Sequence, residues 1–145
     1  MAEISVEIVA YGTPLYDSVT DLRRAILRAP LGLDFTQEEL AAEIADVHFA
    51  ALAGGEVVGT LLLHPINRTT VQLKRMAVAE RAQKQGIGRV LVLAAENYAR
   101  KNNVQTITMH ARETARGFYE SLGYVIDGDP FDEQNIPHIV MFKTI

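Results

Sequence analysis

A short glycine-containing segment, Gln83-Lys84-Gln85-Gly86-Ile87-Gly88-Arg89, holds the residues that most directly suggest chemistry. It stands between an expected strand and a long expected helix. The first amide groups of a helix have no partner within it, and the helix dipole makes this end positive, so an anion can bind there. Gly86 and Gly88 would let a phosphate approach the backbone, and Lys84 and Arg89 add positive charge. The segment therefore predicts a site for a phosphate-bearing ligand.

Two glycines before a helix also suit a plain turn that binds nothing. The segment is not a Walker loop, because no Gly-Lys-Ser/Thr follows, and it is not a dinucleotide fingerprint, because position 91 is Leu. These two failed patterns disfavour a nucleotide-binding regulatory domain. On residues alone, the kind of phosphate ligand stays open.

A second segment, residues 127–133, places four acidic residues within seven positions: Asp127, Asp129, Asp132 and Glu133. Such a segment could attract a cationic amine, for example a polyamine, an aminoglycoside or a lysine side chain. The simpler interpretation is a solvated acidic loop.

The elements that must position these segments alternate along the chain without a linker or repeat. Period-two alternation predicts a strand over 4–8, and Pro14 opens a helix that ends over 29–32. Thr36 and Glu39 have the spacing of a capping box for a short helix with Leu40 and Ile44 on one face. Strands are expected over 47–53, 56–64 and 70–78, joined by short turns as antiparallel neighbours.

The second half alternates in the same way. We expect a helix from Gly86 to about Lys101, a strand over 104–110, a helix over 114–122, and strands over 124–127 and 138–143. The inner face of the long helix is predicted to hold Ile87, Val90, Leu91, Ala94 and Tyr98. The order β-α-α-β-β-β-α-β-α-β-β predicts an α/β (α+β) domain over 1–145, with a mixed, mostly antiparallel sheet flanked by helices.

Composition bounds the function without defining it. The 145 residues carry a net charge of −4 with no cysteine, which argues against a nucleic-acid binder that relies on bulk positive charge. The missing cysteines exclude thiolate metal sites and a cysteine nucleophile, and the four histidines lack metal-site spacing, so no metal is expected. No apolar run is long enough to cross a membrane, and a cytoplasmic protein is expected.

Three motifs together resemble the GCN5-related N-acetyltransferase (GNAT) family. Residues 83–88 match its Q/R-x-x-G-x-G/A pattern after the apolar triplet Met76-Ala77-Val78, and 111–124 look like its A-x-x-F-Y-x-x-x-G-F segment. The closing residues 136–141 resemble the P-H-x-x-M ending of a subset of members. Each motif is weak alone, but their order and spacing over residues 70–142 are specific.

The resemblance implies an N-acetyltransferase that moves an acetyl group from acetyl-CoA directly to a primary amine of a small molecule or peptide. It implies that backbone groups of Met76, Ala77 and Val78 bind the pantetheine and acetyl group, and that the Gln83–Arg89 turn (Gln83, Lys84, Gln85, Gly86, Ile87, Gly88, Arg89) holds the pyrophosphate. A non-catalytic CoA- or acyl-CoA-binding module is the alternative. Dimers are common in such proteins, although no residue here requires one.

Tyr119 matches the tyrosine that often acts as general acid in this family. A phenol can donate a proton to the departing CoA thiolate, whereas packing of the helix onto the sheet is the structural alternative for Tyr119. Arg112 stands where many relatives have asparagine, and the general base is unassigned among Glu113, His110, His138 and water. The resemblance places the acceptor pocket between roughly residues 23–36 and 126–138.

Overall fold

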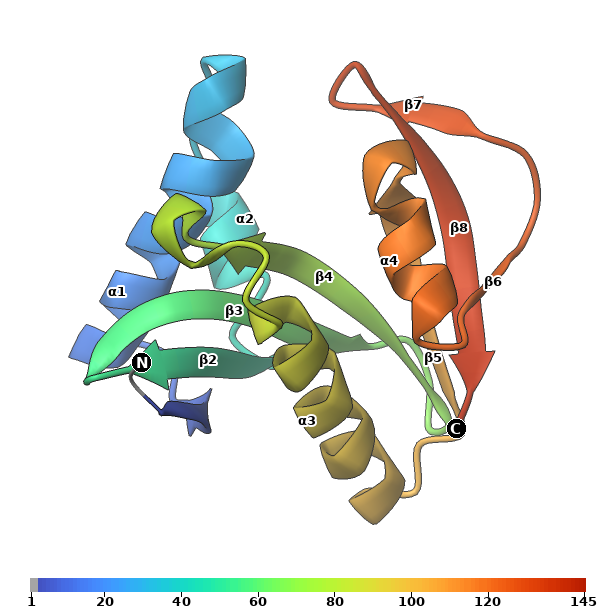
Figure 1. The fold of residues 1–145 in the computed structure, drawn as a ribbon, viewed down its shortest axis with the longest axis horizontal. Coiled ribbons are helices and arrows are strands. Elements are labelled where there is room, and N and C mark those ends of the chain that lie inside the picture. The colour runs from blue at the N-terminus through green and yellow to red at the C-terminus, as the bar shows by residue number, and fades with distance from the viewer. Residues whose placement is uncertain (1–2) are drawn as a thin grey trace.

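The computed structural model describes residues 3–145, so the first two residues of the predicted domain lie outside it. Figure 1 shows one sheet with helices on both of its faces. The strands are β1 (Ile4–Val9), β2 (Val47–Ala53), β3 (Glu56–Pro65), β4 (Thr70–Val78), β5 (Thr106–Arg112), β6 (Val125–Ile126), β7 (Phe131–Glu133) and β8 (Ile136–Thr144). The α-helices are α1 (Pro14–Arg23), α2 (Gln37–Ala41), α3 (Ile87–Lys101) and α4 (Arg116–Ser121). Shorter helical turns are η1 (Arg24–Arg28), η2 (Ala29–Leu31), η3 (Glu80–Ala82) and η4 (Glu113–Ala115).

The sheet follows the order β1-β2-β3-β4-β5-β8-β6, and β7 pairs with β8 outside this path. All the pairings are antiparallel except that of β4 with β5, which is parallel. The predicted fold class, a mostly antiparallel mixed sheet flanked by helices, is therefore confirmed. The parallel pair joins the two halves of the sheet and has α3 as its crossover.

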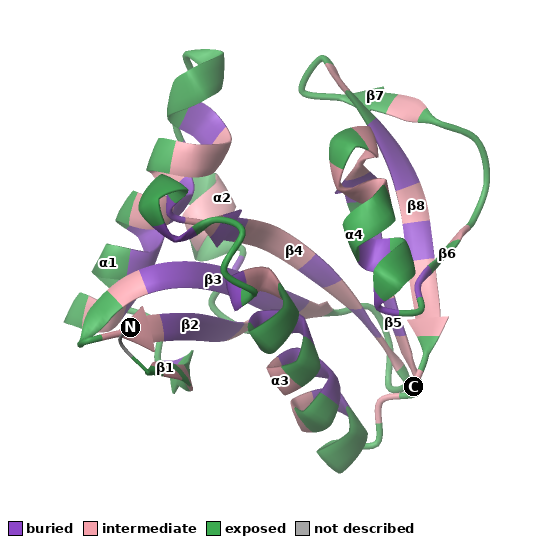
Figure 2. Ribbon diagram, in the orientation of Figure 1, coloured by how far each residue is buried: buried purple, intermediate pink, exposed green. Residues whose placement is uncertain are grey.

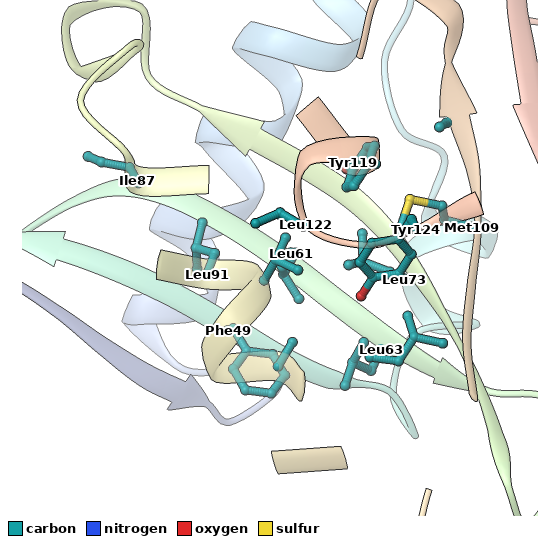
Figure 3. Packing of buried hydrophobic residues seen from close by; sticks show 14 of the residues in the cluster. Phe49, Leu61, Leu63, Leu73, Ile87, Leu91, Met109, Tyr119, Leu122 and Tyr124 are labelled. Carbon is teal, nitrogen blue, oxygen red and sulfur yellow. The ribbon is translucent and has the colours of Figure 1, made fainter. Parts of the chain in front are cut away.

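Two hydrophobic clusters fill the two sides of the sheet, as the burial pattern in Figure 2 shows. The larger cluster lies under α3 and α4 and includes Phe49, Leu61, Leu91 and Tyr119 (Figure 3). The smaller one lies under α1, where Tyr16 and Val19 pack on Ala50 and Val9.

The capping box at the start of α2 is confirmed, since Thr36 Oγ1 accepts from the amide of Glu39 and Glu39 accepts from the amide of Thr36. The predicted inner face of that helix is wrong, because α2 ends at Ala41 and Ile44 is 58% exposed. The buried side chain in this segment is the charged Glu43, which forms a salt bridge with Arg23 of α1.

The predicted inner face of α3 is also partly wrong. Val90 is exposed, and Ala94 and Tyr98 are half-buried, whereas the fully buried residues are Ile87, Leu91, Val92, Ala95, Glu96 and Ala99. Glu96 is buried because Lys143 Nζ lies 3.1 Å from its carboxylate and the Tyr124 hydroxyl donates to it at 2.9 Å. A hydrophobicity pattern places Glu96 on the outside of the helix. Its pairing with Lys143 allows Glu96 to face the sheet instead.

The C-terminal part contains a strand that the sequence pattern missed. Residues 131–133 form β7, which makes a hairpin with β8 in the segment interpreted as an acidic loop. Strand β5 begins at Thr106 rather than Val104, and the helix predicted over 114–122 is shorter, because η4 occupies its first turn.

Candidate active site

The site is built on the separation of β4 from β5. The parallel ladder joins only four residue pairs, from Thr70 with Thr106 to Leu73 with Met109, and beyond it the strands diverge. A cleft of about 560 Å³ lies between them, lined by Lys74 to Val78 on one side and by Met109 to Arg112 on the other. Strand β8 pairs with β5, and Figure 1 shows β4 and β8 close together at the lower right and farther apart toward the top.

A bulge in β4 adds to this divergence. Opposite Leu61 of β3, the strand inserts two residues, Arg75 and Met76, where regular pairing needs one. Arg75 takes a left-handed backbone conformation with φ of 58°. A bulge bends and twists its strand. The last residues of β4 are therefore directed away from β5 while they stay paired to β3.

The expected apolar triplet lies on the cleft side of β4. Ala79, which follows the triplet, donates its amide to the carbonyl of Val58 in β3 at 2.9 Å, and Val78 lies opposite Gly59. Since consecutive residues of a strand direct their amide and carbonyl groups to opposite sides, those of Val78 face the cleft. Met76, Ala77 and Val78 all line it.

The glycine-containing turn begins where the cleft ends. The side-chain amide of Gln83 donates to the Val78 carbonyl at 3.1 Å, which holds the turn against the end of β4. Lys84 and Gly86 have φ of 65° and 82°, and α3 begins at the next residue, Ile87. Within residues 3–145 no side chain caps this helix, so its first amides are available to a ligand.

The residues of the turn have different roles in the structure. Ile87 directs its side chain into the core and can offer a ligand only its backbone. A Cβ at Gly88 would lie 3.1 Å from Phe118 Cζ, so this glycine allows the first turn of α3 to approach α4. Lys84 and Arg89 form no salt bridge among residues 3–145, whereas Arg81 pairs with Glu56 at 2.9 Å.

Tyr119 lines the cleft from α4 and is 5% exposed. Burial raises the pKa of its phenol, so the hydroxyl stays protonated. Tyr124, 5.9 Å away between ring centres, differs in that its hydroxyl is bound to Glu96. Burial and this carboxylate raise the pKa of Tyr124 as well. Figure 3 shows both rings beside Met109 and Leu122 in the large core.

A network of charges lies beside the cleft on the α1 and α2 side, and three of its members, Arg28, Glu39 and Arg75, line the cleft itself. Glu43 accepts from Arg23 at 2.7 Å and from Arg75 at 3.3 Å. The three arginines Arg23, Arg28 and Arg75 surround the ring of Phe35 at 5.0, 4.3 and 5.2 Å. Glu39 pairs with Arg28 at 3.3 Å. Sequence reasoning missed this network, because its members come from four segments that no short-range pattern connects.

The opposite wall is formed by β5 and the β7–β8 hairpin. Glu133 accepts from His110 Nδ1 at 3.0 Å and lies 3.6 Å from His138 Nε2. Burial acts to raise the pKa of Glu133, but the His110 hydrogen bond and the nearby positive groups outweigh it and leave this pKa lowered. Arg112, which pairs in register with His138, also lines the cleft.

The acidic segment is largely outside the site. Asp127, Asp129 and Asp132 are exposed and do not line the cleft, whereas Glu133 does. Of the residues considered as general base, His110 and His138 line the cleft and Glu113 does not. The cleft wall includes residues from 23–36 and from 126–138, as expected for the acceptor side.

The chain belongs to the family defined by the acetyltransferase (GNAT) domain, whose family model matches residues 29–145. The resemblance drawn from the three motifs is therefore confirmed.

Relatives of known sequence agree with this assignment. The chain is 33% identical over 76 residues to the uncharacterized protein YyaT of Bacillus subtilis, a match that covers 52% of this chain and 51% of YyaT. This chain thus matches about half the length of that relative. It is 26% identical over 132 residues to the uncharacterized N-acetyltransferase YitI of the same organism, covering 86% and 89% of the two chains.

Solved structures share the fold over nearly the whole chain. An aminoglycoside 6'-N-acetyltransferase complexed with coenzyme A has a TM-score of 0.82 at 23% identity, with 97% and 96% of the chains covered. A GNAT family acetyltransferase from Elizabethkingia anophelis with acetyl-CoA bound has a TM-score of 0.76 at 21% identity, with 98% of each chain covered. At these identities the likeness establishes the fold.

Proposed function

We propose that this protein is an N-acetyltransferase that moves the acetyl group of acetyl-CoA directly to a primary amine of a small molecule or peptide. The observation that carries this proposal is the continuous path from the cleft between β4 and β5 to the first turn of α3. The cleft offers strand edges to the amides of a pantetheine arm, and the turn offers amides and two cations to a pyrophosphate. Family membership and neighbours solved with CoA or acetyl-CoA support the same ligand.

The cofactor contacts in this proposal differ from those predicted from sequence at Ala77, Gln83 and Gly88. Met76 and Val78 present backbone groups to the pantetheine arm, and Ala77 keeps the strand paired to β3. The pyrophosphate lies over the amides that follow Gly86, between Lys84 and Arg89. Gln83 and Gly88 shape the turn rather than contact the phosphates through their side chains.

Tyr119 is the general acid of the proposed reaction. Attack of the amine on the thioester carbon forms the new C–N bond, and the C–S electron pair leaves with sulfur. Tyr119 lines the cleft and its hydroxyl stays neutral because it is buried, so it can donate the proton that the thiolate needs. With no cysteine in the chain, direct transfer is simpler than an acyl-enzyme route.

The test is an acetyl-CoA transfer assay with a panel of primary amines. We expect free thiol to appear at a rate that depends on one class of amine, together with a product heavier than that amine by one acetyl group. CoA binding without transfer to any amine of a broad panel would favour the non-catalytic binding module. Tight ATP or NAD binding without CoA binding would overturn both.

A further inference from the structure

The proposed reaction needs a group that removes a proton from the attacking amine, and the structure holds a histidine–carboxylate pair in the cleft. His110 Nδ1 lies 3.0 Å from Glu133 Oε1. An ionised carboxylate can only accept, so Nδ1 carries the hydrogen and the other ring nitrogen, Nε2, keeps its lone pair. This is the tautomer that a base requires, held in place by a strand remote in sequence.

Access to solvent distinguishes His110 from the other histidine of the cleft. The His110 side chain is 41% exposed, whereas that of His138 is 7% exposed. His138 donates from Nδ1 to the carbonyl of Ile136 at 2.7 Å and packs its ring near Phe131. Phe131 in turn meets the His110 ring edge to face, 5.2 Å between centres. His138 and Phe131 thus support the ring of His110 while leaving it open to the cleft.

The alternation of β5 separates His110 from Tyr119. Met109 and Ala111 lie in the same buried cluster as Tyr119, under α3 and α4. His110 falls between them in the strand, so its side chain points to the opposite face of the sheet. The cleft is lined by Tyr119 of α4 and also by Arg28 of η1 and Glu39 of α2, so elements on both faces of the sheet contribute to it. A base and an acid can therefore reach one thioester from opposite sides.

We infer that His110, oriented by Glu133, is the general base of the acetyl transfer; this inference rests on the proposed function. As the amine nitrogen bonds to the thioester carbon, His110 Nε2 takes the proton that nitrogen loses. The C–S electron pair leaves with sulfur, which takes the Tyr119 proton. His110 then releases its proton to water, and Tyr119 regains one from water.

The charges around His110 suit this role. Those that line the cleft from the neighbouring strands are Lys74 and Arg75 of β4, Arg112 of β5, Glu133 of β7 and His138 of β8. The cations oppose protonation of an imidazole, and the carboxylate favours it. The Glu133 carboxylate is placed to stabilise the imidazolium that forms when His110 takes the proton.

The experiment compares His110→Gln with His64→Gln. His64 Nδ1 is bound to Asp46 at 2.7 Å, its side chain is 39% exposed, and it does not line the cleft, so it is a matched pair outside the site. We expect His110→Gln to lower kcat/KM about 100-fold with unchanged CoA binding, and His64→Gln to leave kcat/KM unchanged. Glu133→Gln should lose less activity than His110→Gln.

The pH profile separates a base from a structural residue. The acceptor amine contributes a slope of one to log kcat/KM in every variant. A histidine base adds a second unit to the slope of log kcat/KM against pH, at the acidic end of the range from about pH 5 to 8. The His110→Gln variant should lack this second unit. Imidazole in the buffer should restore activity to His110→Ala, because that position is open to solvent.

Wild-type kcat/KM and pH slope retained in His110→Gln would overturn the inference while the proposed function stands. Loss of the second slope in His138→Gln but not in His110→Gln would also overturn it. No thiol release from the wild type with any amine would instead contradict the proposed function itself.

Discussion

The proposed cofactor side and the proposed acceptor side of the cleft are built by different kinds of interaction. On the cofactor side, a strand edge, a turn with left-handed residues and a helix N-terminus present backbone groups. On the acceptor side, η1, α2, β5 and the β7–β8 hairpin present side chains that are paired with one another, including Arg28 with Glu39 and His110 with Glu133. Backbone sites follow from local sequence, whereas paired side chains depend on contacts between distant segments. The acceptor side can therefore vary while the cofactor side stays the same.

Removal of a buried charge should produce the largest effect. Glu43→Gln leaves Arg23, 1% exposed, without its carboxylate, and we expect unfolding free energy to fall by about 3 to 5 kcal/mol. On the cofactor side, Glu56→Gln breaks the exposed pair with Arg81 and should cost less than about 1 kcal/mol. Urea unfolding measures both, and equal losses would show that the two sides do not differ as described.

Tyr119→Phe should affect catalysis more than stability. We expect kcat to fall about 100-fold, because the thiolate loses its proton donor. Tyr124→Phe is the control, since it removes a hydroxyl bound to Glu96 and should destabilise the fold by about 1 kcal/mol without changing kcat. Steady-state kinetics and urea unfolding of both variants test this, and unchanged turnover in Tyr119→Phe would remove it from the mechanism.

A charge at the turn should weaken CoA binding without unfolding the protein. A side chain at Gly86 meets no atom within 4 Å, and both Asp and Asn tolerate its left-handed backbone. Gly86→Asp places a carboxylate where the phosphates bind and should weaken CoA binding about tenfold relative to Gly86→Asn. Calorimetric titration with CoA compares the two, and equal affinities would contradict an anion site there.

The smallest expected effect is the pH dependence that Glu39 contributes to stability. The hydrogen bond from the Thr36 amide lowers the pKa of Glu39; burial opposes it, and Arg28 and Arg75 lower it further. A lowered folded pKa stabilises the protein above the ordinary value of 4.5, and this contribution is lost as pH falls toward the folded value.

Glu39→Gln should therefore be less stable than the wild type at pH 7 by under about 1 kcal/mol, because Glu39 is one-third exposed. The difference should shrink below pH 4.5. Urea unfolding from pH 3 to 7 measures it, and a difference that stays constant with pH would show that the charge of Glu39 contributes nothing.

Sequence reasoning worked where local backbone rules decide the structure. Period-two alternation located β1, strand-like runs joined by short turns located β2 to β4, and Thr36 with Glu39 located the start of α2. Sequence reasoning failed where a residue distant in sequence pairs with a charged side chain and allows that side chain to be buried. Glu43 and Glu96 are buried although hydrophobicity places them outside, because Arg23 and Lys143 compensate their charge.

The candidate site divides in the same way. The turn from Gln83 to Arg89 and the tyrosine at 119 follow from motifs that lie within short stretches of chain. The link between His110 and Glu133 spans 23 residues and depends on β7, which is too short for an alternation pattern to reveal. His110 could be considered as a base from its residue type, but its partner could not be identified.

The short parallel ladder between β4 and β5 also bears on self-association. Beyond Leu73 and Met109, both strands have an edge with unpaired backbone groups, and such edges commonly recruit strands from other chains and start aggregation. Here the two edges face each other across a cleft, with η1 and the β7–β8 hairpin at its walls. These walls flank the two edges where a further strand would pair. Parts of the same chain thus cover the open edges, which is one way in which proteins avoid edge-to-edge association.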